Sequence, residues 1–383
     1  MKLIFTNWRV IFLRKNLLSK LLITILFTVW LVSCATLGGI QSPSPEQPIY
    51  LPTSKSNPRP AQPTSSNPIG LSENQIATLS SLKKIDNYPL YTMHYSGSYT
   101  QFEQPSGAYG KEPSRVYEDS SETSVDWACS LFAVFADTTN MYFGRNFDWE
   151  FSPALLLFTD PPDGYASVSM VDIAYLGFSD EQVRSLTDLP INDRKSLLRA
   201  PNWPFDGMNE RGVVIGMAAV PPGKMHPNPN KETIGSLQIM RQILDKAANV
   251  EQAITILESF NIDFEAGPAL HYLIADSSGK AILVEFYAGQ MHLIHNENPW
   301  HQATNFLLSS VDDPQGNCRR YDTISNKLLR AGGRLTPNSA LELLSSVSQI
   351  NTQWSILYHM GSGDIDVVIG KQFNQPYQFQ LIP

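Results

Sequence analysis

The chain has 383 residues, 42% of them apolar, which is enough for a large core in one or two domains. Its formal net charge of −8, with no basic stripe after the first 20 residues, argues against a nucleic-acid partner. Three cysteines occur, Cys34, Cys129 and Cys318, in contexts too different for a disulfide framework. Because no CxxC or HExxH motif is present, the sequence predicts no metal site and no cofactor.

The N-terminus has the pattern of an export signal. A basic stretch precedes a short apolar run, Leu21–Ser33, which is too short for a comfortable transmembrane helix. The run ends in Leu31–Cys34, which resembles a bacterial lipobox. We therefore expect residues 1–33 to be a lipoprotein signal peptide and Cys34 to be lipidated. The protein would then be exported and membrane-anchored, facing the periplasm or the cell surface. The alternative is an uncleaved signal anchor, in which the apolar run would extend backward through residues 11–13. Arg14, Lys15 and Lys20 interrupt that extension.

Two segments separate this signal from the first buried strand. Residues 34–70 alternate proline with Ser, Thr, Asn and Gln, a composition that predicts an extended, disordered tether. Residues 71–128 are expected to be a partly structured pro-segment. Within it, Ser72 caps a predicted helix that runs to about Lys84, and a strand is expected over 88–100.

A predicted hairpin then begins at Cys129. Apolar alternation over 129–135, a polar turn and a second strand bring Arg145 and Asp148 back beside the cysteine. A thiol beside a guanidinium is expected to have a lowered pKa and to act as a nucleophile. A nearby carboxylate could orient an amine. The structural alternative is a small buried cysteine with an ordinary ion pair beside it.

The later chain alternates strands and helices. Strands are predicted over 154–159, 166–171, 353–359, 364–369 and 377–381, and a hairpin over 271–286. Helices are predicted over 193–199, 236–248, 251–259, 318–332 and 336–348, and Ser179–Gln182 is a plausible capping box at the start of a further helical stretch. His271 opens a core strand and is interpreted as structural rather than as a catalytic base. Strand-rich blocks at both ends, with helices between them, favour sheets packed on sheets and covered by helices.

Several motifs together carry a family resemblance. Cys129-Ser130 followed by Gly144–Trp149 resembles the start of the mature chain in the choloylglycine hydrolases, the linear amide C–N hydrolase family. This family of N-terminal-nucleophile amidohydrolases includes bile salt hydrolases, penicillin V acylases and, more distantly, acid ceramidase. Phe205–Gly216, the hairpin 271–286 and Thr304-Asn305 resemble later blocks of the same family. The resemblance implies an α+β fold, a four-layer αββα sandwich, over residues 129–383.

The resemblance also implies a mechanism centred on Cys129. Autocatalytic cleavage between Ala128 and Cys129 would free an α-amine beside the thiol, and that amine could accept the thiol proton. Asp148 would orient the amine. Arg145 would favour the thiolate and the developing negative charge. This mechanism needs no histidine.

The implied oxyanion site departs from the family pattern at one position. Many relatives have an asparagine where this chain has Ala219, so only the backbone N–H of Ala219 could act there. Asn305, which lies 176 residues after Cys129, matches the family's second oxyanion asparagine. Arg320 best matches an arginine that reaches the active site, with Arg319 as the other candidate.

We therefore expect a hydrolase that cleaves a linear, non-peptide amide of a small N-acyl substrate through an acyl-thioester, or transfers the acyl group to an amine. The acyl group is expected to be apolar. Bile conjugates, N-acylethanolamines, acyl-homoserine lactones and penicillin V all remain open as substrates. Two other classes compete: a papain-like cysteine protease using His271, His301 or His359, and a non-catalytic lipoprotein binding module on the same fold.

Overall fold

The hairpin that begins after Cys129 lies inside a six-stranded sheet. The computed structural model describes residues 70–99, 128–223, 226–264 and 267–382. Within these residues the strand order of this sheet is β14-β3-β4-β15-β16-β17, and every neighbouring pair is antiparallel. The strands are β3 (Ser130–Val134), β4 (Tyr142–Asp148), β14 (Trp300–Ala303), β15 (Thr352–His359), β16 (Asp364–Ile369) and β17 (Tyr377–Gln380).

A second sheet of nine strands lies against the first. Its order is β1-β2-β5-β6-β7-β8-β11-β12-β13 in the part of the chain that the structure describes, and only β2 and β5 pair in parallel. Its strands are β1 (Lys83–Asp86), β2 (Leu90–Tyr95), β5 (Ala154–Thr159), β6 (Ser167–Asp172), β7 (Asp206–Asn209), β8 (Val214–Ala219), β11 (Leu270–Ala275), β12 (Ala281–Tyr287) and β13 (Gln290–His295). Strands β9 (Glu232–Gly235) and β10 (Phe260–Asp263) form a separate, short parallel pair.

The two sheets pack face to face through apolar side chains. At Gly216 in β8, a Cβ atom would lie 2.7 Å from Leu131 and 3.1 Å from Phe143, so a larger residue there would force the facing side chains of the other sheet to shift. Alternate residues of β3 serve different cores, because successive side chains of a strand point to opposite faces. Leu131 lies in the core between the sheets, whereas Phe132 packs beneath helices.

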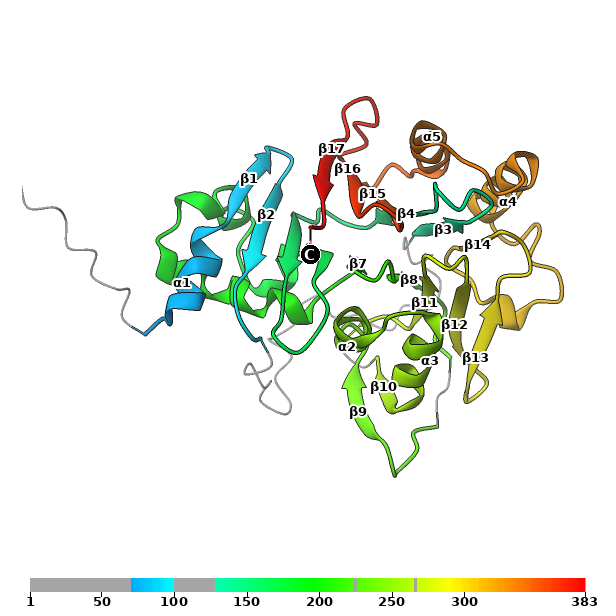
Figure 1. Cartoon of the computed structure of the whole chain (residues 1–383), viewed down its shortest axis with the longest axis horizontal. Helices are drawn as coiled ribbons and strands as arrows, with labels where there is room; N and C mark the ends of the chain where they lie inside the picture. The colour runs from blue at the N-terminus through cyan, green and yellow to red at the C-terminus, as the bar shows by residue number, and fades with distance from the viewer. Residues whose placement is uncertain (1–69, 100–127, 224–225, 265–266, 383) are drawn as a thin grey trace, which may run out of the picture. The chain divides into compact units, whose positions relative to one another are not determined.

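Helices cover the outer faces of the sheets (Figure 1). On the six-stranded sheet lie α4 (Arg319–Ala331) and α5 (Pro337–Val347), which share a core with β3, β4 and β15. On the nine-stranded sheet lie α2 (Gln238–Lys246) and α3 (Val250–Glu258). The predicted caps are present: Asn249 caps α3, Thr336 caps α5, and Gly332 ends α4 in the left-handed conformation. The result is a mixed α+β fold that is rich in sheet.

The segment before Cys129 is built into the larger sheet. After α1 (Glu73–Ser80), strand β2 hydrogen-bonds to both β1 and β5. Tyr91 and Met93 are fully buried in a core with residues of β5, β6 and the 3₁₀ helix Ile191–Asn202. In its described part, the predicted pro-segment 71–128 is thus packed against the later chain.

Some expected boundaries were wrong. The helix that begins after Ser72 ends at Ser80 rather than near Lys84, because Lys83–Asp86 pairs with β2 as a strand. The capping box predicted at Ser179–Gln182 has both of its hydrogen bonds, but the short helix that follows, Gln182–Arg184, is a 3₁₀ helix. The helical piece predicted at 193–199 also lies in a 3₁₀ helix rather than an α-helix. The predicted signal peptide, Cys34, nearly all of the tether and residues 100–127 lie outside the described residues. Among the residues that are described, no helix is both long and apolar enough to cross a membrane.

Candidate active site

Cys129 lies immediately before β3, where it is almost completely buried. The β3–β4 hairpin pairs Leu131 with Arg145, which brings the Arg145 guanidinium toward the cysteine. The Nη2 atom of Arg145 lies 3.9 Å from the Cys129 sulfur. The predicted hairpin therefore does bring these two side chains together.

Arg145 is held in place by a buried anion that the sequence analysis did not single out. Its guanidinium is fully buried and donates a short hydrogen bond to Asp206, which opens β7 in the other sheet. Asp206 also accepts the Tyr358 hydroxyl at 2.6 Å and the Trp354 indole at 3.4 Å. Because an unpaired buried charge is strongly unfavourable, Asp206 is what allows Arg145 to stay beside the thiol.

The expected lowering of the thiol pKa is corrected by the structure. Burial raises the pKa of Cys129, and the Arg145 guanidinium only partly offsets this effect. Desolvation disfavours the charged form of any buried group, and here it outweighs one neighbouring cation. The thiol is therefore protonated at rest, and a nucleophilic Cys129 needs a base that removes its proton during attack.

Asp148, at the end of β4, is buried and only half satisfied. Its Oδ1 accepts a short hydrogen bond from the Thr352 hydroxyl, while its buried Oδ2 has no hydrogen-bond partner among the described residues. Burial raises the pKa of Asp148 to about 7, although the Thr352 bond works in the opposite direction. The Asp148 carboxyl group lies close enough to Cys129 for its negative charge to raise the thiol pKa, while the Asp148 backbone lowers it. Thr352 is a further site residue that the sequence analysis missed.

Asn305 joins three parts of the site. Its Oδ1 accepts the Cys129 backbone N–H at 2.6 Å and an Arg320 guanidinium N–H at 3.0 Å. Both partners can only donate, which fixes the orientation of the amide. The Nδ2 atom of Asn305 therefore faces the other way, and it donates to the Ala219 carbonyl at 2.8 Å.

Ala219 ends β8 with its backbone polar groups turned toward this site. Just beyond β8, the Val220 N–H donates to the Ala269 carbonyl, so Val220 and Ala269 are a hydrogen-bonded pair. The neighbouring pair is Ala219 with Leu270. Bonded and non-bonded pairs alternate along an antiparallel ladder. The N–H and C=O of Ala219 therefore point away from β11, and the carbonyl meets Asn305.

Arg320, and not Arg319, reaches the cysteine. The Nη1 atom of Arg320 donates a short bond to the Cys129 carbonyl and a 3.0 Å bond to the Ser130 hydroxyl. Arg319, the first residue of α4, is exposed. The two candidates that the sequence left open thus lie in different environments.

The histidines that a papain-like mechanism would need are bonded elsewhere. His271 is buried and lies 3.3 Å from Glu285, His301 bonds the Ile294 carbonyl, and His359 bonds Asp366. The interpretation of His271 as a structural residue fits this pairing.

Glu285 has a role that the sequence analysis did not identify. Its two oxygens accept the backbone N–H groups of Leu308 and Ser309, each at 2.8 Å. Glu285 thereby holds the loop that follows Asn305.

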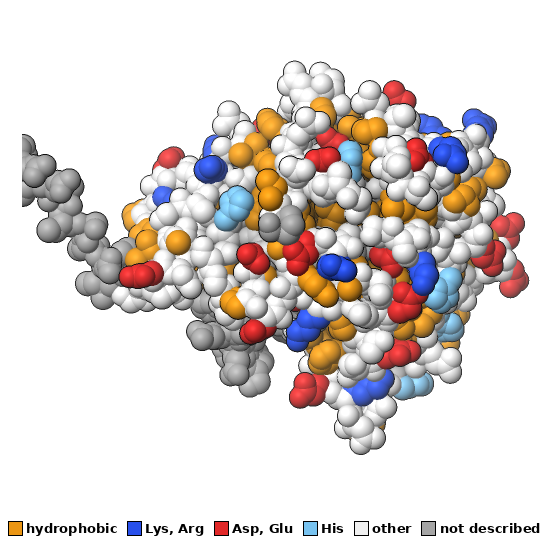
Figure 2. Space-filling view, in the orientation of Figure 1, with side chains coloured by type: hydrophobic (Ala, Val, Ile, Leu, Met, Phe, Trp, Pro, Cys, Tyr) orange, Lys and Arg blue, Asp and Glu red, His pale blue; other side chains and the backbone are white. Residues whose placement is uncertain are grey.

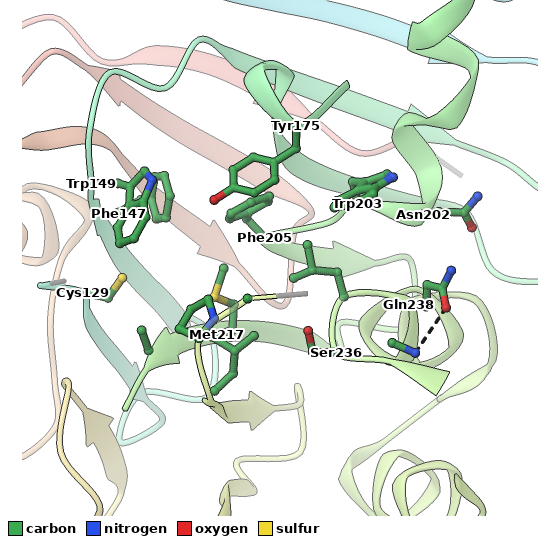
Figure 3. Close-up of a pocket in the computed structure, with 16 residues that line it drawn as sticks. Cys129, Phe147, Trp149, Tyr175, Asn202, Trp203, Phe205, Met217, Ser236 and Gln238 are labelled. Carbon is green, nitrogen blue, oxygen red and sulfur yellow. Dashed lines mark hydrogen bonds between the residues drawn. The ribbon is translucent and has the colours of Figure 1, made fainter. Parts of the chain in front are cut away.

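A cleft of about 780 Å³, including its part open to solvent, leads away from Cys129. Figure 3 shows the Cys129 sulfur at one end, with aromatic side chains along the cleft. The aromatic lining residues are Phe147, Trp149, Tyr175, Trp203 and Phe205.

Known proteins resemble parts of this chain in sequence or in fold. An uncharacterized protein of Paramecium bursaria Chlorella virus 1 is 32% identical over 109 residues, which cover 26% of this chain and 39% of that protein. The chain thus matches well under two thirds of that relative.

Among solved structures, a mutant of the conjugated bile acid hydrolase from Clostridium perfringens aligns with a TM-score of 0.48 and 15% identity, over 66% of this chain and 92% of that one. The penicillin V acylase from Agrobacterium tumefaciens aligns with a TM-score of 0.44 and 15% identity, over 66% and 85%.

A family match is found in the sequence itself. The model for the linear amide C–N hydrolases, choloylglycine hydrolase family, matches residues 129–328, which is more than half of the chain, and the match begins at Cys129. The chain therefore belongs to the choloylglycine hydrolase family of linear amide C–N hydrolases.

Proposed function

We propose that this protein hydrolyses the carbon–nitrogen bond of a linear N-acyl amide, with Cys129 as an N-terminal nucleophile. In this proposal the Ala128–Cys129 bond is first cleaved by the protein itself. The observation that carries the proposal is the buried Asp148 Oδ2 atom, which lacks a hydrogen-bond partner among the described residues beside Cys129. A buried carboxylate oxygen without a partner is unfavourable, and an α-amine on Cys129 would supply one.

The proposed reaction follows from these groups. The α-amine of Cys129, with an ordinary pKa of about 7.7–8.0, takes the thiol proton as the sulfur attacks the substrate carbonyl. The amide C–N bond then breaks, the amine leaves with a proton, and the acyl group remains on sulfur as a thioester. Water hydrolyses the thioester to a carboxylic acid and restores the thiol. Because the amine acts as a base during attack, the raised thiol pKa is compatible with this route.

The tetrahedral oxyanion would be bound by the Ala219 N–H and by Asn305 Nδ2. Each such donor is typically worth roughly 2.7–4 kcal/mol in the transition state. Supporting this assignment, Arg320 and the Cys129 N–H engage Asn305 Oδ1, which turns Nδ2 toward Ala219. The proposed role of Arg145 is to stabilise negative charge on the sulfur, and that of Asp148 is to orient the α-amine.

The test is amine release from a panel of N-acyl amides by the purified full chain. We expect the wild-type chain to release amine from at least one amide with an apolar acyl group, and Cys129→Ala to release none. Cys318→Ala is the matched control, because Cys318 is the other free cysteine among the described residues. Hydrolysis by Cys129→Ala at the wild-type rate would refute the mechanism. Binding without turnover by the wild-type chain would favour a non-catalytic binding module.

Two further proposals concern architecture and location. We propose that the two sheets and the helices on their outer faces form a four-layer αββα sandwich, supported by the contacts at Gly216 and beneath α4 and α5. We also propose that Cys34 is lipidated and anchors the protein to a membrane, on the evidence of the lipobox-like Leu31–Cys34. Membrane fractionation of Cys34→Ser tests the anchor: release into the soluble fraction is expected, and unchanged fractionation with unchanged mass would contradict it.

A further inference from the structure

The end of the cleft opposite Cys129 has a different chemistry from its middle. Figure 3 shows Asn202 and Gln238 at this far end, separated from Cys129 by aromatic side chains. Asn202 ends the 3₁₀ helix Ile191–Asn202, and Gln238 is the first residue of α2. Two amide side chains from separate elements therefore lie where the far end of an acyl group would arrive.

These amides have unused hydrogen-bonding capacity. Gln238 accepts the Gly235 backbone N–H on its Oε1 at 3.2 Å, which leaves both hydrogens of Nε2 available. The Asn202 side chain makes no hydrogen bond to any described residue. Both side chains are partly exposed to the cleft, so a ligand group could reach them.

The cleft lining is uncharged, in contrast to the outside of the molecule. Figure 2 shows acidic and basic side chains interspersed on the visible surface. Of the described residues that line the cleft, none is Asp, Glu, Lys, Arg or His. Moving a charged group out of water without an opposite charge is strongly unfavourable. The part of the substrate that lies in the cleft is therefore expected to be neutral.

The middle of the cleft favours flat groups. Tyr175 contacts Phe205 with ring centroids 5.3 Å apart and Trp203 with centroids 6.0 Å apart, which makes one continuous aromatic wall. Aromatic faces of this kind stack well on rings. Trp203 adjoins Asn202 in sequence, so the wall leads directly to the polar end.

We propose that Asn202 and Gln238 form a distal subsite that selects acyl groups whose far end carries an uncharged hydrogen-bonding group, such as a hydroxyl or a carboxamide. This inference rests on the proposed function, because Cys129 defines which end of the substrate reacts. The subsite rejects acyl groups that end in a carboxylate or an ammonium group, since the described lining offers no opposite charge to offset the loss of water around them.

The experiment measures binding separately from turnover. The wild-type full chain is titrated by calorimetry with non-hydrolysable ketone analogues of N-butyl amides of phenylacetic acid that carry methyl, hydroxyl, carboxamide, carboxylate or aminomethyl groups at the 4-position. The hydroxyl and carboxamide ligands should bind about threefold to tenfold more tightly than the methyl ligand of similar shape. The carboxylate ligand should bind at least about tenfold more weakly.

Variants assign the effect to the two amides. Asn202→Leu should abolish the preference for hydroxyl over methyl. Gln238→Glu keeps an acceptor for Gly235 and adds a carboxylate at the distal end, so it should shift the preference to the aminomethyl cation. Asn230→Asp adds the same charge at an exposed position outside the cleft, and it should leave all preferences unchanged.

Equal affinity of the hydroxyl and methyl ligands, or no binding by the whole series, would overturn the subsite. The subsite would also be refuted if Asn202→Leu kept the preference for hydroxyl over methyl and Gln238→Glu did not shift the preference to the aminomethyl cation. Turnover of the corresponding amides by the wild-type chain separates the two proposals. Binding preference without turnover would refute the hydrolysis and support the subsite, whereas turnover without preference would refute the subsite alone.

Discussion

The hydroxyl of Thr352 is expected to set the protonation of Asp148. The Gln349 backbone N–H donates to Thr352 Oγ1 at 2.7 Å, so the hydroxyl hydrogen is left to bond Asp148 Oδ1. This bond favours the ionised carboxylate, while burial favours the neutral form and raises the Asp148 pKa to about 7. Replacing Thr352 with valine keeps the shape of the side chain and removes both the donor to Asp148 and the acceptor of the Gln349 N–H.

The size of the effect follows from the bond that is lost. A hydrogen bond to a charged group contributes about 1.5–3 kcal/mol, and 1.36 kcal/mol corresponds to about one pKa unit. Thr352→Val should therefore raise the Asp148 pKa from about 7 to about 8–9. A protonated Asp148 carries its proton on Oδ2, because Oδ1 accepts the Thr352 hydroxyl, so Oδ2 is no longer a strong acceptor for the proposed α-amine. Activity needs an ionised Asp148 and a neutral α-amine, whose ordinary pKa is about 7.7–8.0, and it is lost as the pH falls through the higher of these two pKa values. With the Asp148 pKa at about 8–9 in Thr352→Val, the acid limb of the pH profile should move upward.

The assay is kcat/KM against pH for the wild-type chain, Thr352→Val and Thr352→Ser, with one N-acyl amide as substrate. The serine variant keeps the hydroxyl and should keep the wild-type profile. Thermal unfolding of all three proteins checks that the fold is retained. An acid limb at the same pH in the valine variant and the wild-type chain would refute the reasoning.

Three other predictions follow from the same contacts. In steady-state kinetics, Arg320→Ala should lower kcat about tenfold or more, because Asn305 loses one of the donors that orient it. Arg319 is exposed, so Arg319→Ala should change kcat less than twofold. Asp206→Asn leaves the buried Arg145 without its anion, so the free energy of unfolding measured by urea denaturation should fall by about 3–5 kcal/mol. A loss under about 1 kcal/mol would contradict this account. After cleavage, residues 71–99 should remain bound to 129–383, because β2 is hydrogen-bonded inside the sheet; gel filtration in native buffer should give one peak that a denaturing gel resolves into two fragments.

Local sequence patterns predicted those parts of the site that lie close in the chain. The β3–β4 hairpin follows from apolar alternation on both sides of a polar turn, so its spacing alone brings Arg145 back to Cys129. Helix caps such as Asn249 and Thr336 were recognisable because capping depends on residues only three positions apart. The matching of Asn305 and Arg320 to the site came from the family resemblance rather than from local pattern.

The remaining site residues depend on contacts between distant segments. Asp206 meets Arg145 across 61 residues, and Thr352 meets Asp148 across 204, and neither pairing leaves a periodic signal in the sequence. The pKa of Cys129 was predicted with the wrong sign for a related reason. A neighbouring arginine can be inferred from hairpin spacing, but complete burial of the thiol results from how two sheets pack.

The central claim is that Cys129 becomes the N-terminal nucleophile, and the mass of the mature chain tests it most directly. Active protein is purified with its full N-terminal segment, denatured, and measured by intact mass spectrometry together with sequencing of its N-termini. The account predicts a fragment with the mass of residues 129–383 that begins with Cys129, and a separate fragment that ends at Ala128. A single uncleaved chain with full amide hydrolase activity would contradict it.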